Sequence, residues 1–136
     1  MALKIQCLTI DCKNPDALAD VWAAVLGYEI SYKSPQEQAE DREVVISKAG
    51  GHDLLFLQAP DEKVVKNRYH LDLRPDDRDA EVERVIGLGA RRVDIGQGPE
   101  VTWVVLADPE GNEFCILRAL TSEERAEEED VASETW

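Results

Sequence analysis

The stretch YHLDLRPDDRDAEVERVIGLG, residues 69–89, decides the fold because it joins an alternating segment to a capped helix. Polar and apolar side chains alternate at its start, which is typical of a strand with one polar face: His70, Asp72 and Arg74 against Leu71 and Leu73. The acid pair Asp76–Asp77 predicts a helix start, and Gly89 predicts the helix end. The stretch therefore predicts a strand followed by an amphipathic helix.

The same plan occurs earlier, in CLTIDCKNPDALADVWAAVLG, residues 7–27. Asn14 is a favoured N-cap, Pro15 suits the first helical position, and Gly27 suits the helix end. When the two LG ends are aligned with one gap, CLTIDC falls on HLDLRP. Three strand-like segments follow each helix: 28–33, 42–48 and 52–58, then 91–95, 101–107 and 112–120.

This repetition predicts an α+β fold built from tandem β-α-β-β-β modules. We expect one domain over residues 1–120, with the first module at 1–60 and the second at 61–120, followed by an acidic tail at 121–136. The leading strands are expected at residues 3–12 and 69–75. Each module is expected to bury its helix against one face of its sheet.

The other face of each leading strand carries polar or small side chains: Cys7, Thr9 and Asp11 in the first module, and His70, Asp72 and Arg74 in the second. If the two curved sheets face each other, these side chains line a shared cleft. The sequence therefore predicts a half-barrel cavity that binds a small organic molecule.

Composition excludes several classes of partner. The net charge of −14, with no basic stripe, argues against nucleic acid and against anionic membranes. No apolar run is long enough to span a bilayer, and the first residues lack the pattern of a secretory signal, so we expect a cytoplasmic protein. The three cysteines, Cys7, Cys12 and Cys115, form no CxxC pair and are expected to be free thiols.

Three segments resemble the glyoxalase-like branch of the vicinal oxygen chelate superfamily (the glyoxalase/bleomycin resistance/dioxygenase superfamily). They are PDALADVWAAVLGYEI at 15–30, YHLDLRPDDRDAEVERVIGLGA at 69–90 and LADPEGNEFCIL at 106–117. The resemblance implies paired β-α-β-β-β modules around a half-barrel cavity, and a homodimer. In the metal-dependent members of the family, it further implies a divalent ion held by one inward side chain from each of four strands.

In this chain those four positions correspond to Cys7, to Phe56 or Gln58, to His70 and to Cys115. Only His70 retains a ligand of the family, since the metal enzymes carry glutamate where Cys115 stands. We therefore expect no hard-metal site and no metal-dependent glyoxalase activity, and no cofactor is predicted. A zinc site made by Cys7, His70 and Cys115 is the alternative, with the two cysteines as apolar fillers of a cavity wall as the competing interpretation.

The remaining candidates leave alternatives open. His70 and Asp72 form an acid–base pair, or Asp72 pairs with Arg74 or Asp11 and His70 is a hydrogen-bonded wall residue. Arg74 anchors an anionic group of the ligand, or it makes an internal salt bridge to Asp11 or Asp72. Trp103 is either an aromatic wall of the cavity or packed beneath the second helix. Its position on a strand does not decide between them.

The predicted function is binding of a small organic molecule, with metal-independent lyase- or isomerase-type proton transfer. His70 and Asp72 are the expected catalytic residues, and the expected ligand-binding residues are Cys7, Thr9, Asp11, Phe56, Gln58, Arg74, Trp103 and Cys115. The alternative function is a non-enzymatic protein that binds or sequesters a drug-like molecule, as bleomycin-resistance members do.

Overall fold

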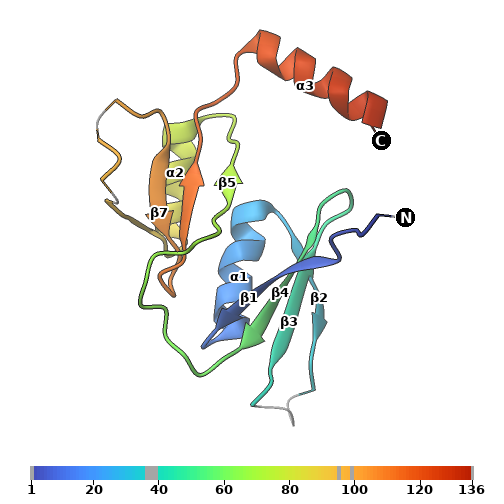
Figure 1. Cartoon of the computed structure of the whole chain (residues 1–136), viewed down its shortest axis with the longest axis vertical. Coiled ribbons are helices and arrows are strands. Elements are labelled where there is room, and N and C mark those ends of the chain that lie inside the picture. Colours follow the sequence, from blue (N-terminus) through green and yellow to red (C-terminus); the bar gives the residue numbers. More distant parts are fainter. Residues whose placement is uncertain (1, 36–39, 95, 99, 136) are drawn as a thin grey trace. The chain divides into compact units, whose positions relative to one another are not determined.

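The computed structural model of the chain describes residues 2–35, 40–94, 96–98 and 100–135 (Figure 1). The chain forms two compact units. The first contains Met1–Lys66 together with Asp108–Asn112, and the second contains Asn67–Ala107 together with Glu113–Trp136. Among the described residues, none of the helices combines the length and the apolar character that crossing a membrane requires.

The first unit is a four-stranded sheet with one helix against it. Its elements are β1 (Cys7–Cys12), α1 (Pro15–Leu26), β2 (Glu29–Lys33), β3 (Glu43–Ser47) and β4 (Asp53–Gln58). The strand order is β1-β4-β3-β2, in which β1 pairs parallel with β4 and the other neighbours are antiparallel.

The second unit repeats this arrangement with shorter strands. Its elements are β5 (Asp72–Leu73), α2 (Arg78–Gly87), β6 (Arg91–Arg92), β7 (Val104–Ala107) and β8 (Glu113–Ile116), followed by the acidic helix α3 (Ser122–Thr135). The strand order β5-β8-β7-β6 matches that of the first sheet, and β5 again pairs parallel with the last strand. The predicted α+β fold of two β-α-β-β-β modules is confirmed.

The predicted helix ends at Asn14, Gly27 and Asp77 are also confirmed, whereas α2 ends at Gly87, two residues before the predicted Gly89. The side chain of Asn14 accepts a hydrogen bond from the Ala17 amide at 3.2 Å, and the side chain of Asp77 accepts one from the Ala80 amide at 3.2 Å. Each bond satisfies an amide of the first helical turn that has no partner within its helix. Gly27 ends α1 with φ of 69°, a left-handed conformation that glycine adopts without steric cost.

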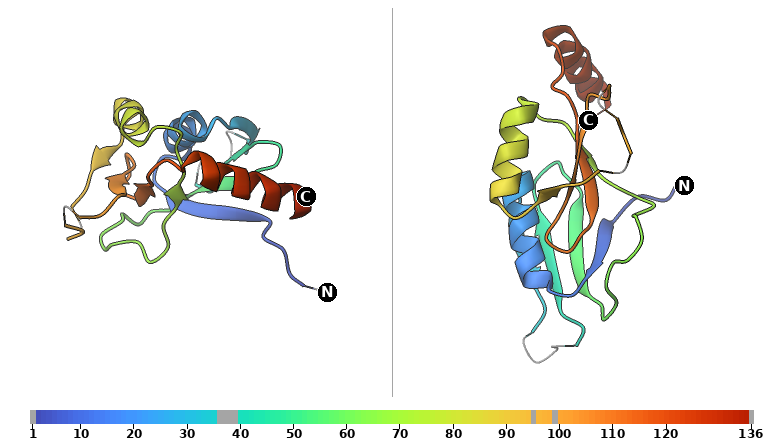
Figure 2. Two further views of the ribbon diagram at one scale, coloured as in Figure 1. Left: turned by 90° about the horizontal axis from the view of Figure 1, so that it is seen from above. Right: turned by 90° about the vertical axis from the view of Figure 1, so that its left-hand side faces the viewer.

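The core of each unit lies between its helix and one face of its sheet. In the first unit, α1 packs on β3 and β4 (Figure 2), and the buried side chains include Leu18, Trp22, Val44, Ile46 and Phe56. In the second unit α2 contacts β8, and the buried side chains include Val82, Val85, Leu106, Phe114 and Ile116. Each large apolar side chain removed from water in this way stabilises the fold by about 1.5–3 kcal/mol.

Several strands are shorter than the alternation of the sequence predicts. The first strand begins at Cys7 rather than at residue 3, and Leu3 is fully exposed, so alternation there is not matched by burial. The strand expected at 69–75 is reduced to Asp72–Leu73. Likewise β6 is Arg91–Arg92, whereas a strand over 91–95 was predicted, of which residue 95 lies outside the described residues.

The turn Asp108–Asn112 belongs to the first unit although it connects β7 and β8. Its buried Asp108 carboxylate accepts hydrogen bonds from the Trp22 indole at 2.9 Å and from the amide of Asn112 at 3.0 Å. The carboxylate of Glu110 accepts bonds from the amides of Lys13 and Asn14, at 2.6 and 2.9 Å. This acidic turn therefore holds the start and the middle of α1, which is a structural role.

Candidate functional site on the polar face of the second sheet

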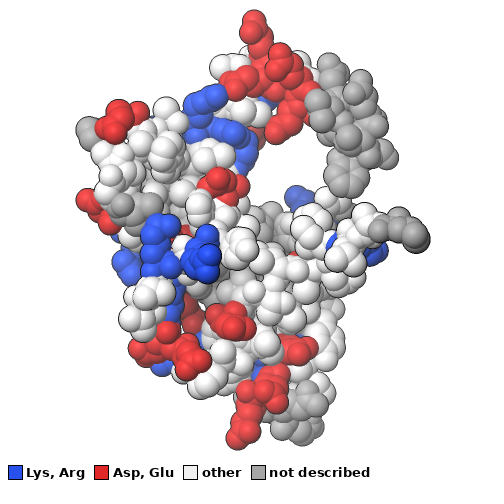
Figure 3. Space-filling model, in the orientation of Figure 1, with Lys and Arg blue, Asp and Glu red and all other residues white. Residues whose placement is uncertain are grey.

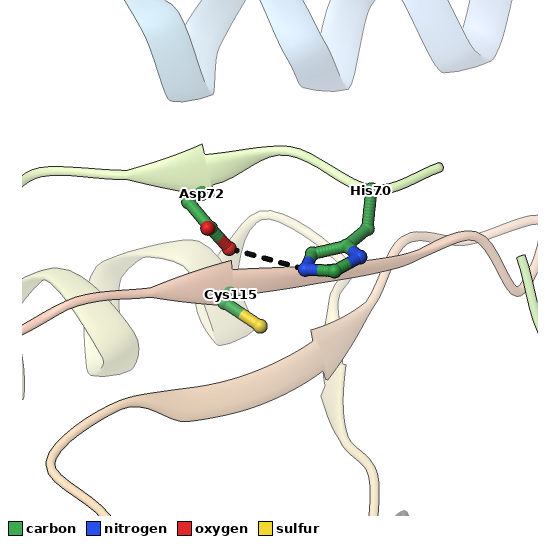
Figure 4. Close-up of side chains that lie close together, drawn as sticks. All are labelled: His70, Asp72 and Cys115. Atoms are coloured by element: carbon green, nitrogen blue, oxygen red, sulfur yellow. Dashed lines mark ion pairs between the residues drawn. The ribbon is translucent and has the colours of Figure 1, made fainter. Parts of the chain in front are cut away.

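Three chemically reactive side chains meet on one face of the second sheet: His70, Asp72 and Cys115 (Figure 4). One imidazole nitrogen, one carboxylate oxygen and the cysteine sulfur all lie within 4.8 Å of one another. Two of the residues come from β5 and the segment before it, and Cys115 comes from β8. The structure therefore brings together both predicted catalytic residues and one predicted ligand-binding residue.

Backbone pairing explains this convergence. Asp72 and Cys115 are register partners in the parallel β5–β8 pair, and neighbouring side chains in register point to the same face of a sheet. The Cys115 amide donates to the Leu71 carbonyl at 2.9 Å, and the Leu117 amide donates to the Leu73 carbonyl at 2.8 Å. These two bonds fix the register, and the two-residue period of extended chain places His70 on the same face as Asp72.

The structure decides which partner Asp72 takes. Its Oδ1 lies 3.3 Å from Nε2 of His70, and both side chains remain partly accessible, at 52% and 40% of their full exposure. The acid–base pair is therefore the interaction that forms. Figure 4 shows the second ring nitrogen, Nδ1, pointing away from Asp72. Because the carboxylate takes one nitrogen, it fixes the ring orientation and leaves the other nitrogen for a ligand.

Arg74 lies one step further along the same face but makes a different contact from those predicted. Its guanidinium donates from Nη1 to the backbone carbonyl of Arg118 at 2.7 Å. The alternatives considered from sequence were an anionic ligand and a carboxylate of Asp11 or Asp72. A bond to a main-chain carbonyl beyond β8 ties the end of β5 to the chain that follows β8, so Arg74 has a structural role in addition to any contact with a ligand.

The first sheet carries the predicted residues Cys7, Thr9 and Asp11. The sulfur of Cys7 lies 3.7 Å from the Thr9 hydroxyl, which places both on one face of β1 as the alternation predicted. Asp11 is exposed. Since these residues belong to the first unit and His70 belongs to the second, the predicted zinc set of Cys7, His70 and Cys115 is not contained in one unit.

The predicted orientation of β4 is wrong. Phe56 is completely buried, and its register partners are Ile10 and Val44, so it lies on the face that α1 covers. Gln58 lies two residues further along the strand and therefore shares that face. Leu55, whose partner is Thr9, takes the place expected for Phe56. The strand period allows two registers, and the burial beneath α1 selects the one that hides the aromatic ring.

Trp103 precedes β7 rather than lying within the strand, and it is 40% exposed. This exposure argues against packing beneath the second helix, and the other alternative, an aromatic wall of the ligand site, stays a prediction.

Burial distinguishes the three cysteines. Cys12 and Cys115 are buried, whereas Cys7 is partly exposed, and all three are free thiols as predicted. Burial, together with the nearby carboxylates of Glu110, Asp108 and Asp11, raises the pKa of the Cys12 thiol to about 12. A thiol with so high a pKa is not a nucleophile at neutral pH. Cys12 is thus a core residue, and Cys115 is the buried thiol that lies beside His70 and Asp72.

Acidic and basic groups are interspersed on the face shown in Figure 3, and acidic side chains gather over α3. Arg118 donates two hydrogen bonds to the Glu124 carboxylate, at 2.9 and 2.8 Å. These bonds and a backbone bond at Thr121 lower the pKa of Glu124 to about 2. The start of the acidic tail is therefore held to the end of the second sheet.

Comparison with known proteins identifies the family. Residues 7–117 match the model of the glyoxalase-like domain, so the chain belongs to that family. No curated protein matches the chain. The fold is also that of a solved structure from the glyoxalase/bleomycin resistance protein/dioxygenase family.

Solved structures share the fold at low identity. Fosfomycin resistance protein FosX from Mesorhizobium loti has a TM-score of 0.67 and 19% identity, covering 93% of this chain and 99% of its own. A FosX variant from Listeria monocytogenes, complexed with Mn(II) and 1S,2S-dihydroxypropylphosphonic acid, has a TM-score of 0.69 and 18% identity, covering 93% and 99%. A glyoxalase/bleomycin resistance protein/dioxygenase family enzyme from Burkholderia phytofirmans PsJN has a TM-score of 0.61 and 19% identity, covering 85% and 98%.

The metal arrangement implied by the family resemblance does not fit the β4 residues expected from the sequence. On the face of β4 shared with Thr9, Leu55 and Leu57 have no ligand atoms, and the one carboxylate, Asp53, stands at the start of the strand as the register partner of Cys7. Phe56 and Gln58, the predicted alternatives, lie on the helix-covered face. No step of the chemistry proposed below therefore uses that four-strand site.

Proposed function

We propose that the protein binds a small organic molecule on the polar face of the second sheet and transfers a proton with His70. The observation that supports this proposal is the ion pair of His70 and Asp72, 3.3 Å apart and partly accessible to solvent. An imidazole held by a carboxylate is the side-chain pair most often used for proton transfer near neutral pH. The lyase- or isomerase-type chemistry predicted from the sequence needs such a group.

The proposed step uses the two ring nitrogens for different tasks. In the proposed step the neutral ring carries its proton on Nε2, next to Oδ1 of Asp72, and its lone pair on Nδ1. Nδ1 then removes a proton from a bound molecule, and the Asp72 carboxylate stabilises the imidazolium that results. The proton returns from Nδ1 to another atom of the molecule, so that no oxidant or cofactor is consumed.

The alternative is a protein that binds or sequesters its ligand without changing it. The same face would then provide hydrogen bonds and shape only. Turnover separates the two functions, since only the enzyme converts its ligand. Homodimerisation, which the family resemblance implies, stays a prediction that light scattering of the purified protein can test.

A thermal-shift screen of small organic acids, amines and carbonyl compounds tests the proposed site. A true ligand should raise the melting temperature of the wild type and of His52→Ala, because His52 lies in the turn before β4 and serves as the matched control. We expect the shift to fall by at least half in Asp72→Asn and to disappear in His70→Ala. A ligand that stabilises His70→Ala as much as the wild type would refute binding at this face.

A further inference from the structure

The donor atoms of His70, Asp72 and Cys115 are arranged around one point. The His70 nitrogen and the Asp72 oxygen are 3.3 Å apart, and the sulfur of Cys115 lies within 4.8 Å of both donors. We propose that these three side chains bind a zinc ion and leave its fourth position open. The site would be built entirely within the second unit.

The geometry is close to that of a zinc site. Zinc binds nitrogen and oxygen ligands at about 2.0–2.2 Å and sulfur at about 2.3 Å in a tetrahedron, which separates the donor atoms by roughly 3.3–3.8 Å. The separation of the His70 and Asp72 donors already matches this range. The sulfur has to approach by about 1.3 Å at most. Rotation of side chains achieves this, because Asp72 and Cys115 are already register partners.

The set of donors selects the metal. A thiolate together with an imidazole favours zinc or cobalt(II) over magnesium or manganese, which prefer oxygen ligands. One carboxylate in the set is compatible with zinc. Three protein ligands and one open position are typical of zinc sites that accept a further ligand, whereas closed sites use four.

The proposed site differs from the arrangement that the family resemblance implies. There, each of four strands contributes one ligand. Here, two ligands come from one extended segment, His70 and Asp72, and the third comes from the neighbouring strand, so that no residue of the first unit takes part. The leucines at the centre of β4 have no ligand atoms to add.

The inference goes beyond the proposed function, since a zinc ion would occupy the Nε2 position that a proton occupies in the proton-transfer scheme. Binding of zinc requires no organic ligand. The two proposals can therefore be tested apart: thermal shifts with organic compounds test the function, and metal content tests the zinc site.

The test is metal binding by the purified full chain after treatment with a chelator. Dialysis against zinc should leave about one zinc per chain, measured by elemental analysis. Cobalt(II) should give a thiolate-to-cobalt charge-transfer band and the intense visible bands of four-coordinate cobalt. Cys115→Ser should lose the charge-transfer band, and Cys115→Ser, His70→Ala and Asp72→Asn should each bind at least tenfold more weakly.

Matched variants keep the test falsifiable. Cys7→Ser and His52→Ala remove the same chemical groups elsewhere, and both should retain one zinc and the charge-transfer band. The circular dichroism spectrum shows whether Cys115→Ser folds. Wild-type protein that retains no metal, or a charge-transfer band that survives in Cys115→Ser and disappears in Cys7→Ser, would overturn the proposal. If zinc binds as expected but no organic compound shifts the melting temperature through His70, the proposed function is refuted and the zinc site stands.

Discussion

The two units use the same strand order for different purposes, and one pair of positions shows this best. In the first unit Thr9 is the register partner of Leu55, and in the second unit Asp72 is the register partner of Cys115. Alignment of CLTIDC with HLDLRP makes Thr9 equivalent to Asp72, and Cys7 equivalent to His70. The same face thus bears a thiol, a hydroxyl and a leucine in one unit, but an imidazole, an acid and a thiol in the other.

The strands that carry these positions also differ in length between the two units. In the first sheet, β1 and β4 pair over six residues each, whereas β5 contains two residues. Arginine side chains donate to main-chain carbonyls in both units, from Arg42 to Ser34 in the first, and from Arg74 to Arg118 and Arg78 to Thr102 in the second. The comparison indicates that one copy of the duplicated unit keeps the longer hydrogen-bonded sheet, while the other carries the cluster of His70, Asp72 and Cys115.

The largest effect is expected for the buried face of the first sheet. Phe56→Ala should lower the free energy of unfolding by about 3–5 kcal/mol, because it removes a fully buried aromatic ring between β4 and α1. Leu55→Ala, on the opposite face, should cost no more than about 2 kcal/mol since this residue is only partly buried. Urea denaturation followed by circular dichroism measures both. If Leu55→Ala were the more damaging change, the assignment of faces would be reversed.

A smaller effect on stability is expected for two acids whose pKa is lowered, Asp16 in the first unit and Glu124 in the second. Two hydrogen bonds from Arg42, each 3.0 Å long, lower the pKa of Asp16 from 3.8 to about 2, and Lys33 adds to the effect. Asp16→Asn should lower the free energy of unfolding at neutral pH by about 1 kcal/mol or less, because the pair is partly exposed.

The dependence on pH gives the sign of this effect. The folded-state pKa of Asp16 is below its ordinary value, so the stabilisation is complete above about pH 4 and is lost as the pH falls towards 2. The difference between wild type and Asp16→Asn in urea titrations should vanish over that range. A difference that grew as the pH fell would contradict the assignment.

Glu124→Gln should instead loosen the start of α3 and leave the global unfolding transition unchanged.

Much of the fold could be predicted from the sequence because its signals are local. Helix ends are set by contacts only a few residues away, as at Asn14, Gly27 and Asp77. The Leu-Gly pair after each predicted helix allowed the two halves of the sequence to be aligned, and this alignment predicted the order of the elements. The short extent of β5 could not be predicted, because alternation of side chains does not reveal how many backbone groups find a partner.

The candidate site was predictable only in part. The alternation placed His70 and Asp72 on one face, and the structure places their side chains in contact. Cys115 lies beside Asp72 because of the register between β5 and β8. These two partners are 43 residues apart in the sequence, so no local pattern reveals that they are neighbours. For Phe56, a strand period of two offered both faces, and only packing against α1 chose between them.

The claim that ligand chemistry resides in the second unit is tested most directly by amide chemical shifts. Isotope-labelled protein is titrated with a compound found in the thermal-shift screen, and the shifts are mapped along the chain. We expect the largest changes at residues 70–74 and 113–117, which surround the pair of Asp72 and Cys115. Largest changes at residues 7–11 and 53–57 would contradict it, because the ligand would then occupy the face of Thr9 and Leu55.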